Sequence, residues 1–87
     1  MSNTFPFRIE TPSGIFIEGQ ISSLEVRTMV GYLGIMARHE PIVAACPPGK
    51  IRICQEGEWT SFSTSRALLS SDGENVCILT SLVKLAI

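Results

Sequence analysis

The sequence has few charged residues and no excess of either sign. Seven Lys and Arg oppose eight Asp and Glu among 87 residues, which gives a formal net charge of −1. Charged residues are 17% of the chain, below the roughly 25% usual in soluble domains. Without a cationic excess, we expect no nucleic-acid partner. Apolar residues are 45% of the chain. A domain this small cannot bury them all, so we expect part of that surface to meet a protein partner.

Long apolar runs are also missing. None approaches the roughly 18–20 residues that a membrane-spanning helix needs, so we expect no direct membrane insertion. The first six residues show neither a basic nor an apolar region of a secretory signal. The three cysteines, Cys46, Cys54 and Cys77, are odd in number and widely spaced. In a chain without such a signal, this pattern is typical of reduced thiols in a cytosolic compartment.

Catalytic and ligand-binding groups are scarce. His39 is the single histidine, and the cysteines stand eight and 23 positions apart, which does not match the spacing of zinc ligands. A phosphate-binding loop needs G-x-x-x-x-G-K followed by Ser or Thr, but Gly49 and Lys50 are followed by Ile51. We therefore expect no catalytic residue, no metal, no cofactor and no small-molecule substrate.

What the sequence does contain is a period-2 pattern of apolar and polar residues, clear at 5–10, 23–28 and 50–53. Glu56-Gly57 and Asp72-Gly73 are hairpin turn signals, and no stretch sustains a helical stripe. We predict an all-β fold, an antiparallel β-sandwich of about eight to ten short strands in one domain over residues 1–87. For residues 81–87, a strand and a helical turn both remain open. Trp59 is expected in the core, with an interface anchor as the alternative.

Residues 28–53 are the most informative stretch. They contain two glycines three apart, then Arg38-His39-Glu40-Pro41, and later Pro47-Pro48-Gly49. A loop with a charged tip and apolar flanks suits a contact surface. We predict four structural loop residues, with the first two glycines required for positive φ or close packing. The four are Gly31, Gly34, Pro41 and Gly49.

This stretch resembles the N-terminal β-sandwich domain of the ε subunit of F-type ATP synthases, called δ in mitochondria. The family pattern is approximately G-x-L-G-I-x-x-x-H-x-P, followed some ten residues later by P-G-x-[IV]-[RK]. The resemblance covers roughly residues 5 to 80, and Tyr32 departs from it, standing where the family often has an acidic residue. The matching residues are Gly31, Leu33, Gly34, Ile35, His39, Pro41, Pro48, Gly49, Ile51 and Arg52.

The resemblance implies a non-catalytic central-stalk subunit of a rotary F1Fo ATP synthase. Such a subunit docks on the γ subunit, contacts the c ring and helps couple proton-driven rotation to ATP synthesis or hydrolysis. It would lie peripherally at the cytoplasmic face of the inner membrane, in the F1 sector. The candidate partner-binding side chains are Tyr32, Arg38, His39 and Glu40. For His39, capping of a turn through backbone groups is an equally weighted alternative.

Typical family members continue into a helical hairpin that inhibits the motor and, in some bacteria, binds ATP. The sequence contains no such hairpin, so neither role is implied here. We expect a natural full-length chain from a lineage without the hairpin, with a deliberately shortened form as the rival interpretation. The alternative function is a free-standing β-sandwich that binds a protein or peptide.

Overall fold

The computed structural model describes residues 3–86, which form ten strands and no helix. Within this range there is accordingly no helix long and apolar enough to cross a membrane. The predicted all-β class and strand number are confirmed. The strands are β1 (Phe5–Thr11), β2 (Gly14–Ile21), β3 (Ser23–Thr28), β4 (Gly31–Met36), β5 (Ile42–Cys46), β6 (Gly49–Gln55), β7 (Glu58–Thr64), β8 (Ala67–Ser71), β9 (Val76–Thr80) and β10 (Val83–Leu85).

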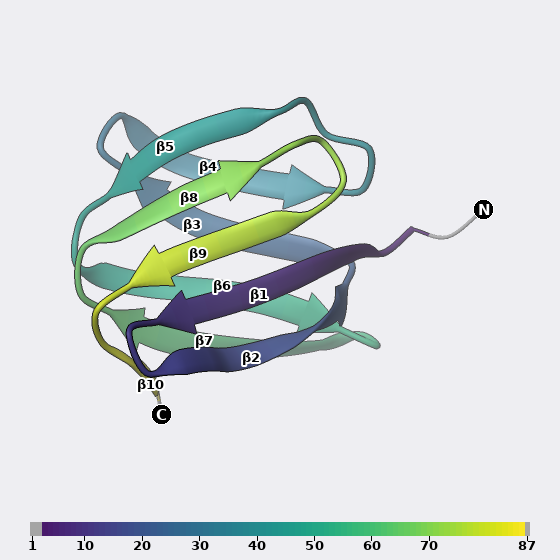
Figure 1. The fold of residues 1–87 in the computed structure, drawn as a ribbon. Coiled ribbons are helices and arrows are strands. Elements are labelled where there is room, and N and C mark those ends of the chain that lie inside the picture. The colour runs from purple at the N-terminus through teal and green to yellow at the C-terminus, as the bar shows by residue number, and fades with distance from the viewer. Residues whose placement is uncertain (1–2, 87) are drawn as a thin grey trace.

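The strands form two five-stranded sheets packed face to face (Figure 1). Sheet A has the order β2-β1-β9-β8-β5, and sheet B has the order β10-β7-β6-β3-β4. Among the described residues one pairing is parallel, that of β1 with β9, and the others are antiparallel. A parallel pair cannot be joined by a hairpin, and here the whole of the intervening chain connects the two strands.

The core lies between the sheets and is built by the alternation seen in the sequence. Phe5, Phe7 and Ile9 of β1 face inward while their neighbours face solvent, because successive side chains of a strand point to opposite faces. Each fully buried aliphatic side chain contributes about 1.5–3 kcal/mol through removal from water. The buried apolar cluster comprises Phe5, Phe7, Ile9, Ile21, Leu24, Val26, Ile35, Cys46, Ile51, Ile53, Phe62, Leu69, Val76 and Ile78.

Both expected hairpin turns are present. Glu56 and Gly57 have φ values of 50° and 82°, as a two-residue type I′ turn requires. In the second turn, the Asp72 carboxylate accepts hydrogen bonds from the backbone N–H groups of Glu74 (2.9 Å) and Asn75 (2.8 Å). These bonds, chiefly that from Asn75, lower the pKa of Asp72 below its ordinary value.

The sheets settle the structure of residues 83–85 and correct the position expected for Trp59. Residues 83–85 form β10, which pairs with β7, so the strand alternative for the C-terminal stretch is correct there; residue 87 lies outside the described residues. Trp59 was expected in the core but is 43% exposed. Because Phe62 of the same strand faces inward, the alternation of β7 turns Trp59 outward.

Candidate functional site

The predicted glycine loop is mostly strand. Gly31 and Gly34 belong to β4 and Gly49 begins β6, so the loop assignment is wrong for these three; Pro41 does lie between strands. Leu33 and Ile35 face the core cluster, and their burial draws the segment into sheet B. Gly31 has the expected positive φ, 129°. Gly34 has no positive φ, and a Cβ placed on it would meet no atom within 4 Å, so the reason predicted for this glycine is wrong.

The four candidate partner-binding residues do not lie together. Tyr32 is the second residue of β4, beside Arg27 and close to the β3–β4 turn. Arg38, His39 and Glu40 follow the far end of the same strand. A six-residue strand is about 20 Å long. Tyr32 and the 38–40 loop therefore occupy opposite ends of the sandwich.

The His39 side chain contacts three segments of the chain. Its Nδ1 lies 3.0 Å from the Met36 carbonyl oxygen, and its Nε2 hydrogen bonds with the Ser71 hydroxyl of β8. The ring also meets the Phe5 ring edge-on, with 5.5 Å between centroids. The backbone contact matches the turn-capping interpretation of this histidine; partner contact by His39 stays a prediction.

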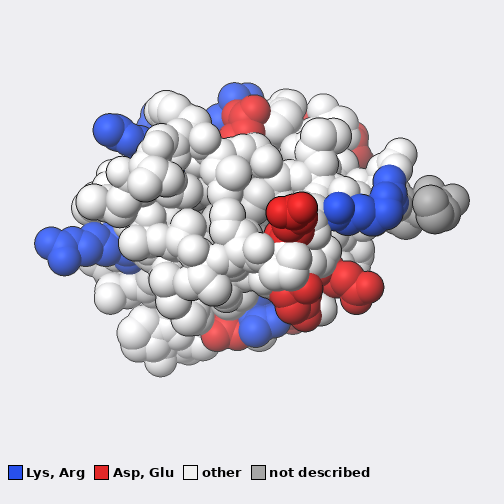
Figure 2. All heavy atoms as spheres, turned by 90° about the horizontal axis from the view of Figure 1, so that it is seen from above, with Lys and Arg blue, Asp and Glu red and all other residues white. Residues whose placement is uncertain are grey.

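The end that holds the 38–40 loop is acidic. Five of the eight acidic residues lie in its loops and strand starts, and Arg38 is the cation among them. Seen from above, the acidic side chains in view lie mostly toward this end, at the right (Figure 2). Arg38 itself has a φ of 60° and donates a hydrogen bond to Asn3 Oδ1 at 3.3 Å. The five acids are Glu40, Glu56, Glu58, Asp72 and Glu74.

The turns of the opposite end, at the left of Figure 1, are nearly uncharged, and we call it the uncharged end for these turns, although sheet B carries Arg27, Lys50 and Lys84 one residue inside them. Its five turns, at 11–14, 28–31, 46–49, 64–67 and 80–83, contain Arg66 as their one charged residue. Met29 and Val30 form the β3–β4 turn and are 68% and 96% exposed. Sequence reasoning missed this pair, although two apolar residues in a two-residue hairpin turn, where Asn, Asp and Gly are favoured, are a readable signal.

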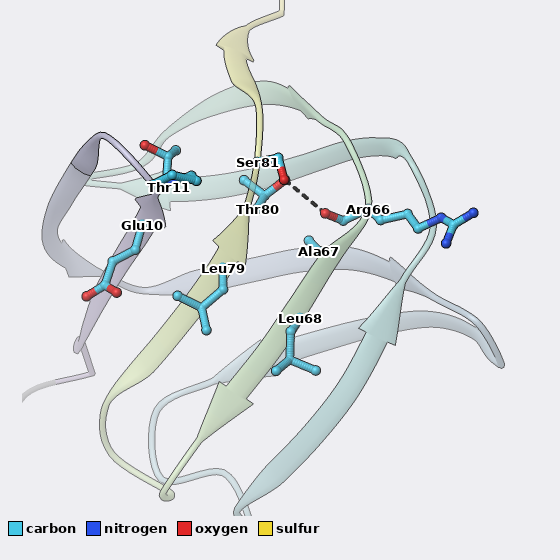
Figure 3. Close-up of a pocket in the computed structure, with 9 residues that line it drawn as sticks. Glu10, Thr11, Arg66, Ala67, Leu68, Leu79, Thr80 and Ser81 are labelled. Atoms are coloured by element: carbon cyan, nitrogen blue, oxygen red, sulfur yellow. Dashed lines mark hydrogen bonds between the residues drawn. The ribbon is translucent and has the colours of Figure 1, made fainter.

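A second apolar surface, also missed, lies on the outer face of sheet A. The register brings Ala45, Leu68 and Leu79 side by side across β5, β8 and β9, with Val43 next to them. All four are exposed, and we call them the sheet A patch. Leu68 and Leu79 project from neighbouring strands into a shallow hollow beside Glu10, whereas the Arg66 side chain points away from it (Figure 3).

The described residues offer little for catalysis. Cys46, Cys54 and Cys77 are free and buried, and burial raises the pKa values of Cys46 and Cys77 above the ordinary thiol value. A thiol held in this way is a poor nucleophile. No group of three or more His, Cys, Asp or Glu within residues 3–86 could hold a metal ion.

Comparison with known proteins identifies the family. The family model described as "ATP synthase, Delta/Epsilon chain, beta-sandwich domain" matches residues 4–86. The chain belongs to this family. Among curated relatives, the ATP synthase epsilon chain of Ruminococcus albus is 35% identical over 81 residues, covering 92% of this chain and 60% of the relative. That of Caldicellulosiruptor saccharolyticus is 34% identical over 80 residues, covering 92% and 58%.

Solved structures share the fold of this delta/epsilon domain. A chain of the mitochondrial ATP synthase of Euglena gracilis (OSCP/F1/c-ring) superposes with a TM-score of 0.89 at 19% identity, covering 98% of this chain and 55% of the other. A chain of the Tetrahymena thermophila mitochondrial ATP synthase (central stalk/c-ring) gives 0.78 at 14%, covering 91% and 64%. The delta/epsilon domain spans about three fifths of the length of the curated relatives above.

Proposed function

We propose that this domain is a non-catalytic central-stalk subunit of a rotary F1Fo ATP synthase. It docks on the γ subunit, contacts the c ring and helps couple ring rotation to ATP synthesis or hydrolysis, peripherally at the cytoplasmic face of the inner membrane. The observation that carries the proposal is the family match, which spans the complete sandwich from residue 4 to residue 86. The structural neighbours come from assemblies whose titles name F1, the c ring and the central stalk, which supports the same role.

The uncharged end is the proposed contact with the c ring. Exposed Met29 and Val30 at its tip gain about 25 cal/mol for each Å² of apolar surface that a partner covers. Tyr32 stands beside them on β4 and carries both an aromatic ring and a hydroxyl, a combination enriched at interfaces. This assignment keeps Tyr32 as a partner-binding residue at the ring.

The sheet A patch is the proposed contact with γ. A contiguous group of exposed apolar side chains on one sheet face is a typical mark of a protein–protein interface. The 38–40 loop follows β4 and leads directly into β5, the strand that carries Val43 and Ala45, so Arg38 and Glu40 can flank the same interface. His39 serves this surface by fixing the loop that carries them.

Two pairs of variants test both contacts, each serving as the control for the other. Val43→Asp with Leu68→Asp should abolish binding to purified γ subunit, whereas Met29→Asp with Val30→Asp should leave it intact. In reconstituted complexes the second pair should lose recovery of the c ring. All four positions are exposed, so melting temperatures should stay close to that of the unmodified chain. If the unmodified chain, used as bait, recovers neither γ nor c subunits but only unrelated proteins, the stalk proposal fails in favour of a free-standing binding module.

A further inference from the structure

The outer face of sheet B concentrates positive charge in a chain that is acidic overall. Four of the seven cations lie on it, including both lysines, against one of the eight acids, Glu25. The register places Ser63 of β7 between Lys50 of β6 and Lys84 of β10. On the other side of Lys50, the pairing of Val26 with Ile51 places the next residue of β3, Arg27, next to Lys50. Arg27, Lys50 and Lys84 therefore form a row across the sheet, which we call the cationic row.

The one acid of this face is already neutralised. Arg52 Nη1 lies 2.8 Å from Glu25 Oε1, and the guanidinium carbon lies 4.5 Å from the centre of the Trp59 ring. The ion pair and the cation–π contact hold Arg52 flat against the sheet. The three members of the cationic row make no ion pair among the described residues. The face therefore presents uncompensated positive charge along the cationic row, and the exposed Trp59 lies farther along the same face, against Arg52.

Gly34 opens a notch in the same face. Tyr32, Gly34 and Met36 alternate with half-buried Leu33 and buried Ile35 along β4, so all three point outward, and Tyr32 and Met36 are 83% and 66% exposed. A small hollow beside Gly34 is lined by Glu25, Tyr32 and Leu33. A glycine inside a strand costs roughly 0.5–1 kcal/mol relative to alanine. Since neither backbone φ nor packing within the chain requires it, its explanation lies in what approaches from outside.

We propose that the outer face of sheet B docks on an acidic, extended segment of a partner protein. Carboxylates of that segment pair with the cationic row, and its backbone approaches β4, the edge strand of sheet B, at the notch between Tyr32 and Met36. The face also carries two aromatic–arginine neighbours, Trp59 with Arg52 and Tyr32 with Arg27, residue types that are enriched at binding hot spots. The proposal rests on the proposed function in one respect, which is that the partner is sought among the neighbouring subunits of the ATP synthase.

Carbodiimide cross-linking of the complex isolated through a tag on this chain gives a direct test, because it joins lysine amines only to carboxylates in contact. Lys50 and Lys84 are the only lysines of the chain, and both lie on the proposed surface. We expect mass spectrometry to find one or both joined to an Asp or Glu of another subunit. Lys50→Arg with Lys84→Arg should remove the link while preserving assembly. Lysines that are unlinked, or linked only within the chain, would overturn the proposal.

Binding to the complex stripped of this chain provides the second measurement. Arg27→Glu with Lys50→Glu should weaken binding at least about tenfold at low salt and flatten its salt dependence, since exposed charges are strongly screened. The control is Gln20→Glu, which adds negative charge at an exposed position of β2, in sheet A and outside the face. Gly34→Ala should weaken binding several-fold without lowering stability, because a Cβ at this position meets no atom of the chain within 4 Å. Equal binding by all these variants would refute the docking face.

The two proposals can fail separately. If the unmodified chain binds the stripped complex but the lysines stay unlinked and the variants bind normally, the docking face is wrong and the stalk function stands. If the chain does not bind that complex while its lysines link to acidic residues of another protein, the stalk function fails and the docking face stands. Binding to phosphatidylglycerol vesicles that is lost in Arg27→Glu with Lys50→Glu, without loss of complex binding, would assign the face to a membrane surface and overturn the proposal.

Discussion

Replacing His39 by alanine tests whether this side chain is structural. Its Nδ1 faces the Met36 carbonyl oxygen, which can only accept, so Nδ1 carries the proton and donates it. Nε2 then accepts the hydroxyl proton of Ser71, and Ser71 Oγ accepts the backbone N–H of Gly73 at 3.0 Å. The network joins the 38–40 loop to the β8–β9 turn at the acidic end of the sandwich.

The expected cost follows from what the alanine variant loses. Two hydrogen bonds contribute about 0.5–1.5 kcal/mol each, and the edge-on contact with Phe5 adds roughly 0.5–1.5 kcal/mol. Because His39 is only half-buried, water can take over part of these hydrogen bonds and ring contacts in the variant. We therefore expect a loss of about 2 kcal/mol in the free energy of unfolding. For a domain of this size such a loss lowers the melting temperature by roughly 10 °C.

Urea titration followed by the fluorescence of Trp59, the single tryptophan, measures this loss. Ser71→Ala is the matched variant, and the double variant should reveal a coupling energy of about 1 kcal/mol between the two side chains. A loss below about 0.5 kcal/mol with no coupling would refute the structural interpretation. If His39→Ala folds as stably as the unmodified chain yet no longer binds the stripped complex, His39 is a contact residue instead.

Other substitutions and titrations give separate checks. Gly34→Ala should stabilise the isolated chain by roughly 0.5–1 kcal/mol, whereas Gly31→Ala should destabilise it by about 1–3 kcal/mol. The reason is that Gly31, unlike Gly34, has a positive φ. Equal changes in the free energy of unfolding, measured by urea titration, would contradict this. Cys46 and Cys77 should react with iodoacetamide at pH 8 at least about tenfold more slowly in the folded chain than in urea, since burial raises both pKa values; equal rates would be inconsistent with it. The pKa of Asp72 is lowered in the folded chain, so the ionised carboxylate stabilises the fold at pH values above the ordinary Asp pKa of about 3.9. This contribution disappears as the pH falls through the lowered pKa. The difference in melting temperature between the unmodified chain and Asp72→Ala should therefore narrow between about pH 5 and pH 2, and a constant difference would contradict the assignment.

The fold was predictable because its signals are local. Alternation at residues 5–10 and 23–28 records which face of each strand is buried, and Glu56-Gly57 records a turn that needs positive φ. The parallel pairing of β1 with β9 was not predictable in this way, because the two strands are separated by most of the chain. Trp59 could have been placed outside by the same alternation, since it has the opposite parity to buried Phe62.

The candidate site was only partly predictable. The family pattern identified the informative residues, but it carries no orientation, and a six-residue strand separates Tyr32 from the loop that begins near Arg38. Two of the three partners of His39 come from residues 5 and 71, far along the chain in either direction. The sheet A patch likewise depends on the register between strands that are distant in sequence. The alternation within one strand predicts that Leu68 is exposed, but it does not show which residues of the neighbouring strands lie beside it.

The arrangement of the strands suits the proposed contacts of one small domain with several partners. Nearly every strand extends between the acidic end and the uncharged end, in one direction or the other, so any load applied at Met29 and Val30 is carried along extended backbones to the opposite loops. The closely packed core between the sheets resists their sliding past each other. The proposed contacts at the uncharged end, the sheet A patch and the outer face of sheet B are therefore held at fixed separations within a body of 34 × 25 × 22 Å. A rotary coupling element needs that property, because motion imposed at one contact reaches the others without being absorbed by deformation.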